Sequence, residues 1–246
     1  MAQFSDDLYV GTAFIGGSNV SAGPAPMTMG VGPVGRVYCF DVVALTKQAA
    51  QLAASANPGS GASFTLIAGT GVTSRVRSDG TTEYVLDTPR NVSIAAAGAN
   101  TATYLVTGYD QYGQKMSETF AAPSTSTVSG KKAFKTVISV TNNNATAGTN
   151  GLTVGYGDTL GLPLRVTDAA YVTRVGWNNV LAEDAGTFTK ADVTDPATTS
   201  TGDVRGTYLP SEANNGSKRL VIVFALPALA VGPSATRVGA AGVTQV

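Results

Sequence analysis

The sequence predicts an all-β fold, an antiparallel β-sandwich of the jelly-roll kind, and three observations support it. Short apolar runs recur along the 246 residues and are mostly of strand length. Most of these runs alternate apolar with polar side chains, which is typical of strands with one buried and one wet face. Clusters of Gly, Asn, Asp and Ser separate the runs and favour tight turns. A chain of this length can bury a real hydrophobic core.

The chain begins with a segment of unusual composition. Residues 8–35 contain seven Gly and three Pro but no charged side chain. A disordered tail is usually charged or polar, whereas this segment carries apolar side chains without helical or strand periodicity. We therefore predict an extended arm over residues 1–35 that lies on its own domain or on a neighbouring subunit. Its predicted interface residues are Phe14, Ile15, Met27 and Met29.

The β-sandwich domain is predicted over residues 36–228, with a first strand at 36–45. Residues 47–57 are rich in Ala and Gln, which favour helices, so a short helix is predicted there. Residues 184–217 are poor in strand patterns and are predicted to form a long surface loop, a kind that is usually functional. Residues 229–246 are predicted to form an extended tail. Further strands are predicted at 63–72, 81–87, 90–98, 101–110, 115–123, 131–142, 151–158, 169–177 and 218–226.

Composition argues against several classes of function. The 16 basic and 16 acidic residues cancel, so attraction to nucleic acid or to an anionic membrane is not expected. The chain has no histidine, which removes Ser-His-Asp and Cys-His catalysis and His-based metal sites. The single cysteine, Cys39, lies in an apolar run and is expected to be a buried core thiol. We expect no enzyme activity, no catalytic residues, no cofactor and no metal.

The segment 107–120 is the first candidate site. It predicts a β-hairpin with its tip at residues 111–114 and gathers Tyr109, Asp110, Tyr112 and Lys115. One interpretation is a tip that binds a sugar or a protein. The other is a tight turn, in which Asp110 accepts backbone N–H groups and Gly113 supplies a positive φ. We favour the turn, with Tyr109 and Tyr112 as contacts for a neighbouring subunit before a sugar.

Other candidates have simpler structural interpretations. The glycines of residues 154–163 are expected to shape a turn or bulge, because no Gly-Lys-Ser/Thr follows them as in a phosphate-binding loop. Trp177 is expected to pack in the core or at an interface. Residues 131–135 contain three lysines, which are expected to protect a strand edge. Four acids of the long loop match no calcium motif and are expected to be solvated: Asp184, Asp192, Asp195 and Asp203.

Several phrases resemble a family. "TPRNVSIAAAGANTATYLVTGYDQYGQKMSETF", "GKKAFKTVISV", "VGYGDTLGLPLRV" and "DVRGTYLP" with "NNGSKRLVIVFAL" resemble tailed-bacteriophage virion proteins of the capsid decoration or cement type. The resemblance covers roughly residues 88–226. It implies a β-sandwich that binds the outer surface of a phage capsid, and it carries no catalytic residues with it.

The expected partner is therefore the major capsid protein, contacted through the sandwich and the arms, and the expected location is the capsid surface after synthesis in the host cytoplasm. A homo-oligomer, dimer or trimer, is expected because such proteins occupy symmetry axes. Two alternatives stay open: a head–tail junction or tail component, and a glycan-binding module that attaches virions to cells.

Overall fold

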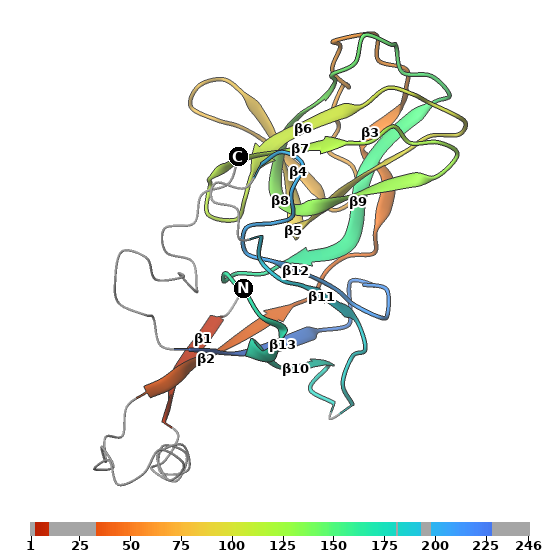
Figure 1. The fold of residues 1–246 in the computed structure, drawn as a ribbon. Helices are drawn as coiled ribbons and strands as arrows, with labels where there is room; N and C mark the ends of the chain where they lie inside the picture. Colours follow the sequence, from red (N-terminus) through yellow and green to blue (C-terminus); the bar gives the residue numbers. More distant parts are fainter. Residues whose placement is uncertain (1–2, 10–32, 181, 193–197, 228–246) are drawn as a thin grey trace, which may run out of the picture.

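The computed structural model describes residues 3–9, 33–180, 182–192 and 198–227, and it confirms the predicted all-β, antiparallel architecture. The strands form one sheet of four and one of nine. Figure 1 shows the nine-stranded sheet curled at one end of the molecule and the four-stranded sheet at the other. Helix within the described residues is limited to the single turn η1 (Ala169–Tyr171). No described helix is long and apolar enough to cross a membrane.

The four-stranded sheet combines both ends of the described chain. Its order is β1-β2-β13-β10, formed by β1 (Gln3–Tyr9), β2 (Pro33–Val42), β13 (Leu220–Pro227) and β10 (Val172–Trp177). Tyr9 is paired with Pro33, and Gly35 is paired with Pro227. Tyr9, Pro33 and Pro227 therefore lie at the same end of the sheet.

The nine-stranded sheet has the order β11-β12-β9-β5-β8-β6-β7, with β3 paired to β9 and β4 paired to β5. All of its pairs are antiparallel. Its strands are β3 (Gln48–Ala56), β4 (Val72–Val76), β5 (Thr82–Ala95), β6 (Tyr104–Tyr109), β7 (Lys115–Phe120), β8 (Thr127–Asn142), β9 (Leu152–Gly161), β11 (Thr187–Thr189) and β12 (Thr207–Leu209).

Two hydrophobic clusters hold the fold together. The larger one consists of alternate side chains of the nine-stranded sheet, such as Tyr104 and Val106 of β6, which are fully buried. The smaller one lies between the two sheets, where Phe40 and Ile222 pack with Leu160 of β9. Apolar area removed from water is the main favourable contribution to folding, so the second cluster stabilises the docking of the sheets.

The helix predicted over residues 47–57 is wrong, because this segment forms β3. Its backbone pairs with β9, and Leu52 and Ala53 are buried in the larger cluster. Gly155 of β9 permits the approach, since a Cβ atom there would lie 1.8 Å from the carbonyl oxygen of Gln48. Helix propensity is a weak preference per residue, and tertiary pairing overrides it here.

Two further strand predictions differ from the structure. The strands predicted at 81–87 and 90–98 are one strand, β5, and the register shifts across the segment that holds Pro89. Proline in a central strand is tolerated at such a shift because no ladder donor is needed there. The strand predicted at 63–72 is largely wrong. Phe64 N–H donates to Val140 of β8 and Ile67 N–H donates to Leu52 of β3, so the segment changes partner and continues neither ladder.

The predicted arm and tail lie mostly outside the described residues, and so do Phe14, Ile15, Met27 and Met29. Their roles stay predictions. The described parts of the arm are β1 and the first residues of β2, from Pro33 to Gly35, and these two strands pair with each other.

Candidate functional site

The predicted hairpin is confirmed, and its turn is built by Asp110. The Asp110 N–H donates to the carbonyl of Gln114, and the Asp110 carboxylate accepts the N–H groups of Tyr112 and Gln114 at 2.8 and 2.9 Å. Gly113 has a φ of 78°, a conformation that side-chain-bearing residues rarely adopt. The turn interpretation of these residues therefore holds.

The hairpin tip also docks on the chain's own long loop, which the sequence did not predict. The second oxygen of Asp110 forms an ion pair of 2.5 Å with Arg205, and both side chains are almost fully buried. The guanidinium of Arg205 lies 4.7 Å from the centre of the Tyr112 ring. The Tyr112 hydroxyl donates to the carbonyl of Pro163 at 2.6 Å. Tyr112 is about half exposed, so one part of its ring stays accessible.

On its other side the hairpin tip forms a wall of a polar groove of about 260 Å³, here called the arginine groove. Tyr109 of β6, Thr136 of β8 and Val85 of β5 lie in one row across three neighbouring strands. This row alternates with core positions such as Val106 and Leu86, so the groove lies on the sheet face opposite the larger cluster. Its lining residues are Arg75, Arg77, Glu83, Val85, Tyr109, Asp110, Gln111, Gly113, Lys135 and Thr136.

Glu83 positions the two arginines of the groove. Its side chain is buried, and its two oxygens bind Arg75 Nε and Arg77 Nη1 separately. Arg77 also lies over the Tyr109 ring, 4.4 Å from its centre. Arg75 remains mostly exposed, and its two terminal nitrogens are not used by Glu83. The groove thus presents fixed guanidinium groups toward solvent.

Lys135 supplies the third cation of the groove. Its ammonium donates to the carbonyls of Leu86 and Asp87 at 2.6 and 3.0 Å. Burial lowers the pKa of Lys135, and the Asp87 carboxylate opposes that shift. Three cations therefore line the groove against two carboxylates, and one of those carboxylates, Asp110, is already paired with Arg205.

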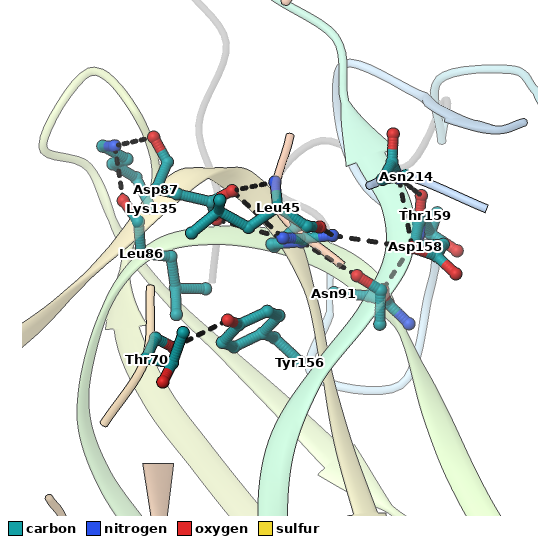
Figure 2. A network of polar contacts seen from close by, with 12 residues as sticks. Leu45, Thr70, Leu86, Asp87, Asn91, Lys135, Tyr156, Asp158, Thr159 and Asn214 are labelled. Atoms are coloured by element: carbon teal, nitrogen blue, oxygen red, sulfur yellow. Dashed lines mark hydrogen bonds and ion pairs between the residues drawn. The ribbon is translucent and has the colours of Figure 1, made fainter. Parts of the chain in front are cut away.

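Figure 2 shows a second polar cluster, here called the Arg90 network, in which Arg90 itself is fully buried. Arg90 of β5 donates to the carbonyls of Gly157 and Leu45 at 2.8 and 2.9 Å and to both oxygens of Asp87 at 3.1 Å. Its guanidinium lies 4.6 Å from the centre of the Tyr156 ring. Leu45 belongs to the connection between β2 and β3, where the chain passes from the four-stranded sheet to the nine-stranded one. Arg90 therefore joins the two sheets at this connection.

Asp158 extends the Arg90 network to the segment that precedes β13. It lies 3.7 Å from Arg90 Nη2 and accepts Asn214 Nδ2 at 3.2 Å. Leu45 N–H in turn donates to Asp87 at 2.8 Å. Since each of these groups is hydrogen-bonded, the buried charges are compensated and the relative position of the sheets is fixed.

The lysines at 131–135 do not protect an edge, which corrects that prediction. Strand β8 lies between β5 and β6, in the middle of the sheet. Lys132 is fully buried, whereas Lys131 is exposed. Glu118 accepts the backbone N–H groups of Lys131 and Lys132, and its burial raises its pKa to about 7. Burial lowers the pKa of Lys132, which the Glu118 and Asp203 carboxylates oppose.

The prediction of solvated acids in the long loop is wrong for two of the four. Asp184 accepts hydrogen bonds from Tyr208 Oη at 2.6 Å and Trp177 Nε1 at 2.9 Å. Burial disfavours its charge, but hydrogen bonds from Ser211 and Tyr208 outweigh burial and lower the pKa of Asp184. Asp203 is buried and accepts the N–H of Ala133 at 3.0 Å.

These acids attach the loop to the sheets, so they build structure. Asp192 accepts the N–H of Gly202 at 3.1 Å, and Asp195 lies outside the described residues. No group of three acid, cysteine or histidine side chains in the described part of the chain is arranged to hold a metal ion.

Residues 152–161 form the strand β9, and the predicted bulge is present where its register with β5 shifts. Trp177 packs against the smaller hydrophobic cluster, as predicted. Cys39 is only partly buried and lies outside both clusters, so its assignment as a core thiol is wrong. Burial, followed by the nearby Asp41 carboxylate, raises the pKa of the Cys39 thiol, with Arg219 opposing.

Of the six predicted interface residues, the structure describes only Tyr109 and Tyr112, which belong to one hairpin. An arginine guanidinium group lies over each of the two rings. The arginine groove was missed because its cations come from two segments far apart in the sequence, Arg75 and Arg77 at the end of β4 and Lys135 in β8. The spacing of Arg75 and Arg77, two residues apart before a turn, was the one local signal. No protein-family model, no curated protein and no solved structure matches this chain.

Proposed function

We propose that this chain is a structural protein of a tailed-bacteriophage particle, which binds the outer surface of the capsid and decorates or cements it. The partner is the major capsid protein, and the protein acts as a dimer or trimer at symmetry axes. The proposal is motivated by the sequence phrases over residues 88–226 that resemble virion proteins of this type. An all-β domain is compatible with it.

One structural observation carries the proposal. The pairs Tyr9–Pro33 and Gly35–Pro227 place the starts of segments 10–32 and 228–246 at the same end of the four-stranded sheet. Segment 10–32 has no charged residue, and segment 228–246 has only Arg237. Depletion of charge is typical of the centre of a protein–protein interface. Two such segments that start side by side favour a single binding region at this end.

The Arg90 network supports a cementing role. It fixes the four-stranded sheet to the nine-stranded one through buried hydrogen bonds. A force applied to the four-stranded sheet is then transmitted to the nine-stranded sheet without the two moving apart. This property suits a protein that bridges capsomers.

The glycan-binding alternative is less well supported by the same structure. A sugar stacks on an open aromatic face, but Arg77 covers one face of Tyr109 and Arg205 covers one face of Tyr112. A location at the head–tail junction or in the tail is distinguished by copy number. Decoration requires on the order of hundreds of copies per particle, and a symmetric junction ring about six or twelve.

The pairing of Tyr9 with Pro33 allows a precise test. Replacing residues 10–32 with a short Asn-Gly turn should leave β1 paired to β2, because such turns join antiparallel strands directly. Co-sedimentation with purified capsids that lack this protein measures binding. We expect the affinity to fall at least about tenfold, as lost apolar contacts predict.

A second variant separates composition from length. It keeps residues 10–32 but replaces Phe14, Ile15, Met27 and Met29 with serine, and it should bind as weakly as the first. Thermal unfolding provides the folding control for both variants. Capsid binding equal to that of the unchanged chain in both would refute the role of this segment.

A further inference from the structure

We propose that strand β4 and the arginine groove bind an extended segment of a partner protein with the pattern acidic–apolar–acidic, which adds to the sheet beside β4. This inference is independent of the proposed capsid function, because it requires only a partner of that chemistry.

The first argument is the open edge of β4. Strand β4 pairs with β5 on one side, and no other strand in the described part of the chain pairs with its second side. After Val72, the four remaining residues of β4 are all exposed. An edge strand offers unpaired N–H and C=O groups, to which an extended peptide binds by backbone hydrogen bonds.

The second argument is the charge beside this edge. Arg75 lies in β4 and Arg77 follows it two residues later, so alternation along the strand brings both to the same face. Glu83 holds both guanidinium groups but occupies only Nε of Arg75 and Nη1 of Arg77. Asp79 approaches Arg77 Nε at 3.9 Å and is itself 60 % exposed, so it competes weakly. Guanidinium groups fixed in this way bind carboxylates through paired hydrogen bonds.

The third argument is Val76, between the two arginines. Its side chain is 70 % exposed, the largest exposure among the large hydrophobic residues in the described part of the chain. Because side chains alternate along a strand, Val76 faces away from Arg75 and Arg77. A strand added beside β4 places one side chain opposite each of these three residues. The complementary sequence is therefore a carboxylate, an apolar residue and a second carboxylate.

The groove favours a peptide over a small anion. Lys135 and Tyr109 extend the lining beyond the two arginines, and the groove of about 260 Å³ continues to the hairpin tip. Lys135 and Tyr109 lie on β8 and β6, across β5 from β4, so a strand added beside β4 contacts the arginine end of the groove. A single inorganic anion satisfies one guanidinium group and leaves Val76 and the edge of β4 uncovered.

The test uses the full chain and three capped peptides, titrated by calorimetry. The first contains glutamate–valine–glutamate, the second contains glutamine–valine–glutamine, and the third has proline in place of the central valine. We expect the first to bind at least about tenfold more tightly than the second, because two charge-assisted hydrogen-bonded pairs are lost. Proline removes a backbone donor and should weaken binding by a similar factor.

Two variants locate the site. Arg75→Gln should lower the affinity for the acidic peptide about tenfold. Val76→Glu keeps both ion pairs of Glu83 and adds a repelling charge, so it should reduce binding even if Arg75→Gln proves unstable. Lys190→Gln, an exposed lysine that does not line the groove, is the matched control and should leave binding unchanged.

Each contrary result overturns the proposal. Equal binding of the acidic and glutamine peptides removes the charge argument, and equal binding of the proline peptide removes strand addition. Inorganic phosphate that displaces the acidic peptide at the same concentration points to a simple anion site instead. Concentration-dependent dimerisation abolished by Val76→Glu identifies a second copy of this chain as the occupant.

Discussion

Two arginine–carboxylate clusters in this protein have opposite character. In the Arg90 network all three guanidinium nitrogens have partners, and Arg90 is fully buried. In the arginine groove Glu83 is equally buried, but Arg75 is 68 % exposed and two of its nitrogens are left for a further partner. The first cluster joins the two sheets, and the second faces solvent next to the open edge of β4.

The difference shows how to separate structural charges from binding charges. A buried charge is tolerated only when its hydrogen bonds are complete, and removal of one partner then strongly destabilises the folded protein. Removal of an exposed arginine that is fixed by one buried acid lowers the stability of the protein only slightly. The donors of that arginine that remain free are nevertheless already oriented for a ligand. The number of donors that remain, and not the presence of an ion pair, distinguishes the two clusters.

The largest effect is expected for Arg90→Leu. It removes the ion-pair partner of Asp87 and leaves Asp158 with only the exposed Lys47, whose Nζ lies 3.6 Å away, so the free energy of unfolding should fall by about 3–5 kcal/mol. Urea unfolding monitored by circular dichroism measures this. A loss below about 1 kcal/mol would mean that the Arg90 network does not hold the sheets together.

Glu118 tests whether a buried carboxylate behaves in the same way when its hydrogen bonds come from backbone N–H groups and the Lys132 cation is nearby. Burial raises its pKa to about 7 from 4.5. The folded state then retains a proton that the unfolded state has lost, so the free energy of unfolding falls as pH rises through this window, by about 3 kcal/mol in total.

The pH effect is measured by urea unfolding at about pH 5 and about pH 8, for the natural chain and for Glu118→Gln. The variant cannot ionise at this position, so its stability should fall less over the same interval. An identical pH dependence of the two proteins contradicts a raised pKa at Glu118.

Asp110 is intermediate, because its partner Arg205 is buried and two of the Arg205 nitrogens, Nε and Nη2, have no hydrogen-bond partner among the described residues. Asp110→Asn retains an oxygen for the turn but removes the charge opposite Arg205. We expect a loss of about 2 kcal/mol, the usual value for a hydrogen bond to a charged group. Thermal unfolding provides the measurement, and Lys115→Gln, an exposed residue next to the turn, is the control.

Arg75→Leu should have the smallest effect, below about 1 kcal/mol, because exposed ion pairs contribute little and Arg77 still binds Glu83 at 3.1 Å. The same urea experiment compares it directly with Arg90→Leu. A loss as large as that of Arg90→Leu would erase the distinction between the two clusters.

Local residue chemistry was enough to predict some elements. Asp110 and Gly113 predicted the hairpin turn, since an acceptor and a positive φ are needed at these positions whatever surrounds them. Alternation of side chains predicted most strands in the same way. The strand β3 was not predictable, because its Ala and Gln residues favour a helix until β9 is beside them.

Neither arginine cluster could be found in the same way. Arg90 meets Leu45, 45 residues earlier, and Gly157, 67 residues later. The lysines of β8 were assigned to an edge because sequence does not show which strands are central. Likewise, the acids of the long loop were expected in solvent because their hydroxyl and indole partners lie in other elements.

The sequence by itself determined the all-β class, the hairpin at 107–120 and the uncharged character of the segments at both ends, because these depend on local alternation, turn residues and composition. Only the tertiary structure decided which strands are edges, that Tyr9, Pro33 and Pro227 lie at the same end of the four-stranded sheet, and which arginines have all their nitrogens hydrogen-bonded. The physical reason is that strand pairing and burial join residues far apart in the chain. Whether a charge is structural or available for binding depends on those distant partners.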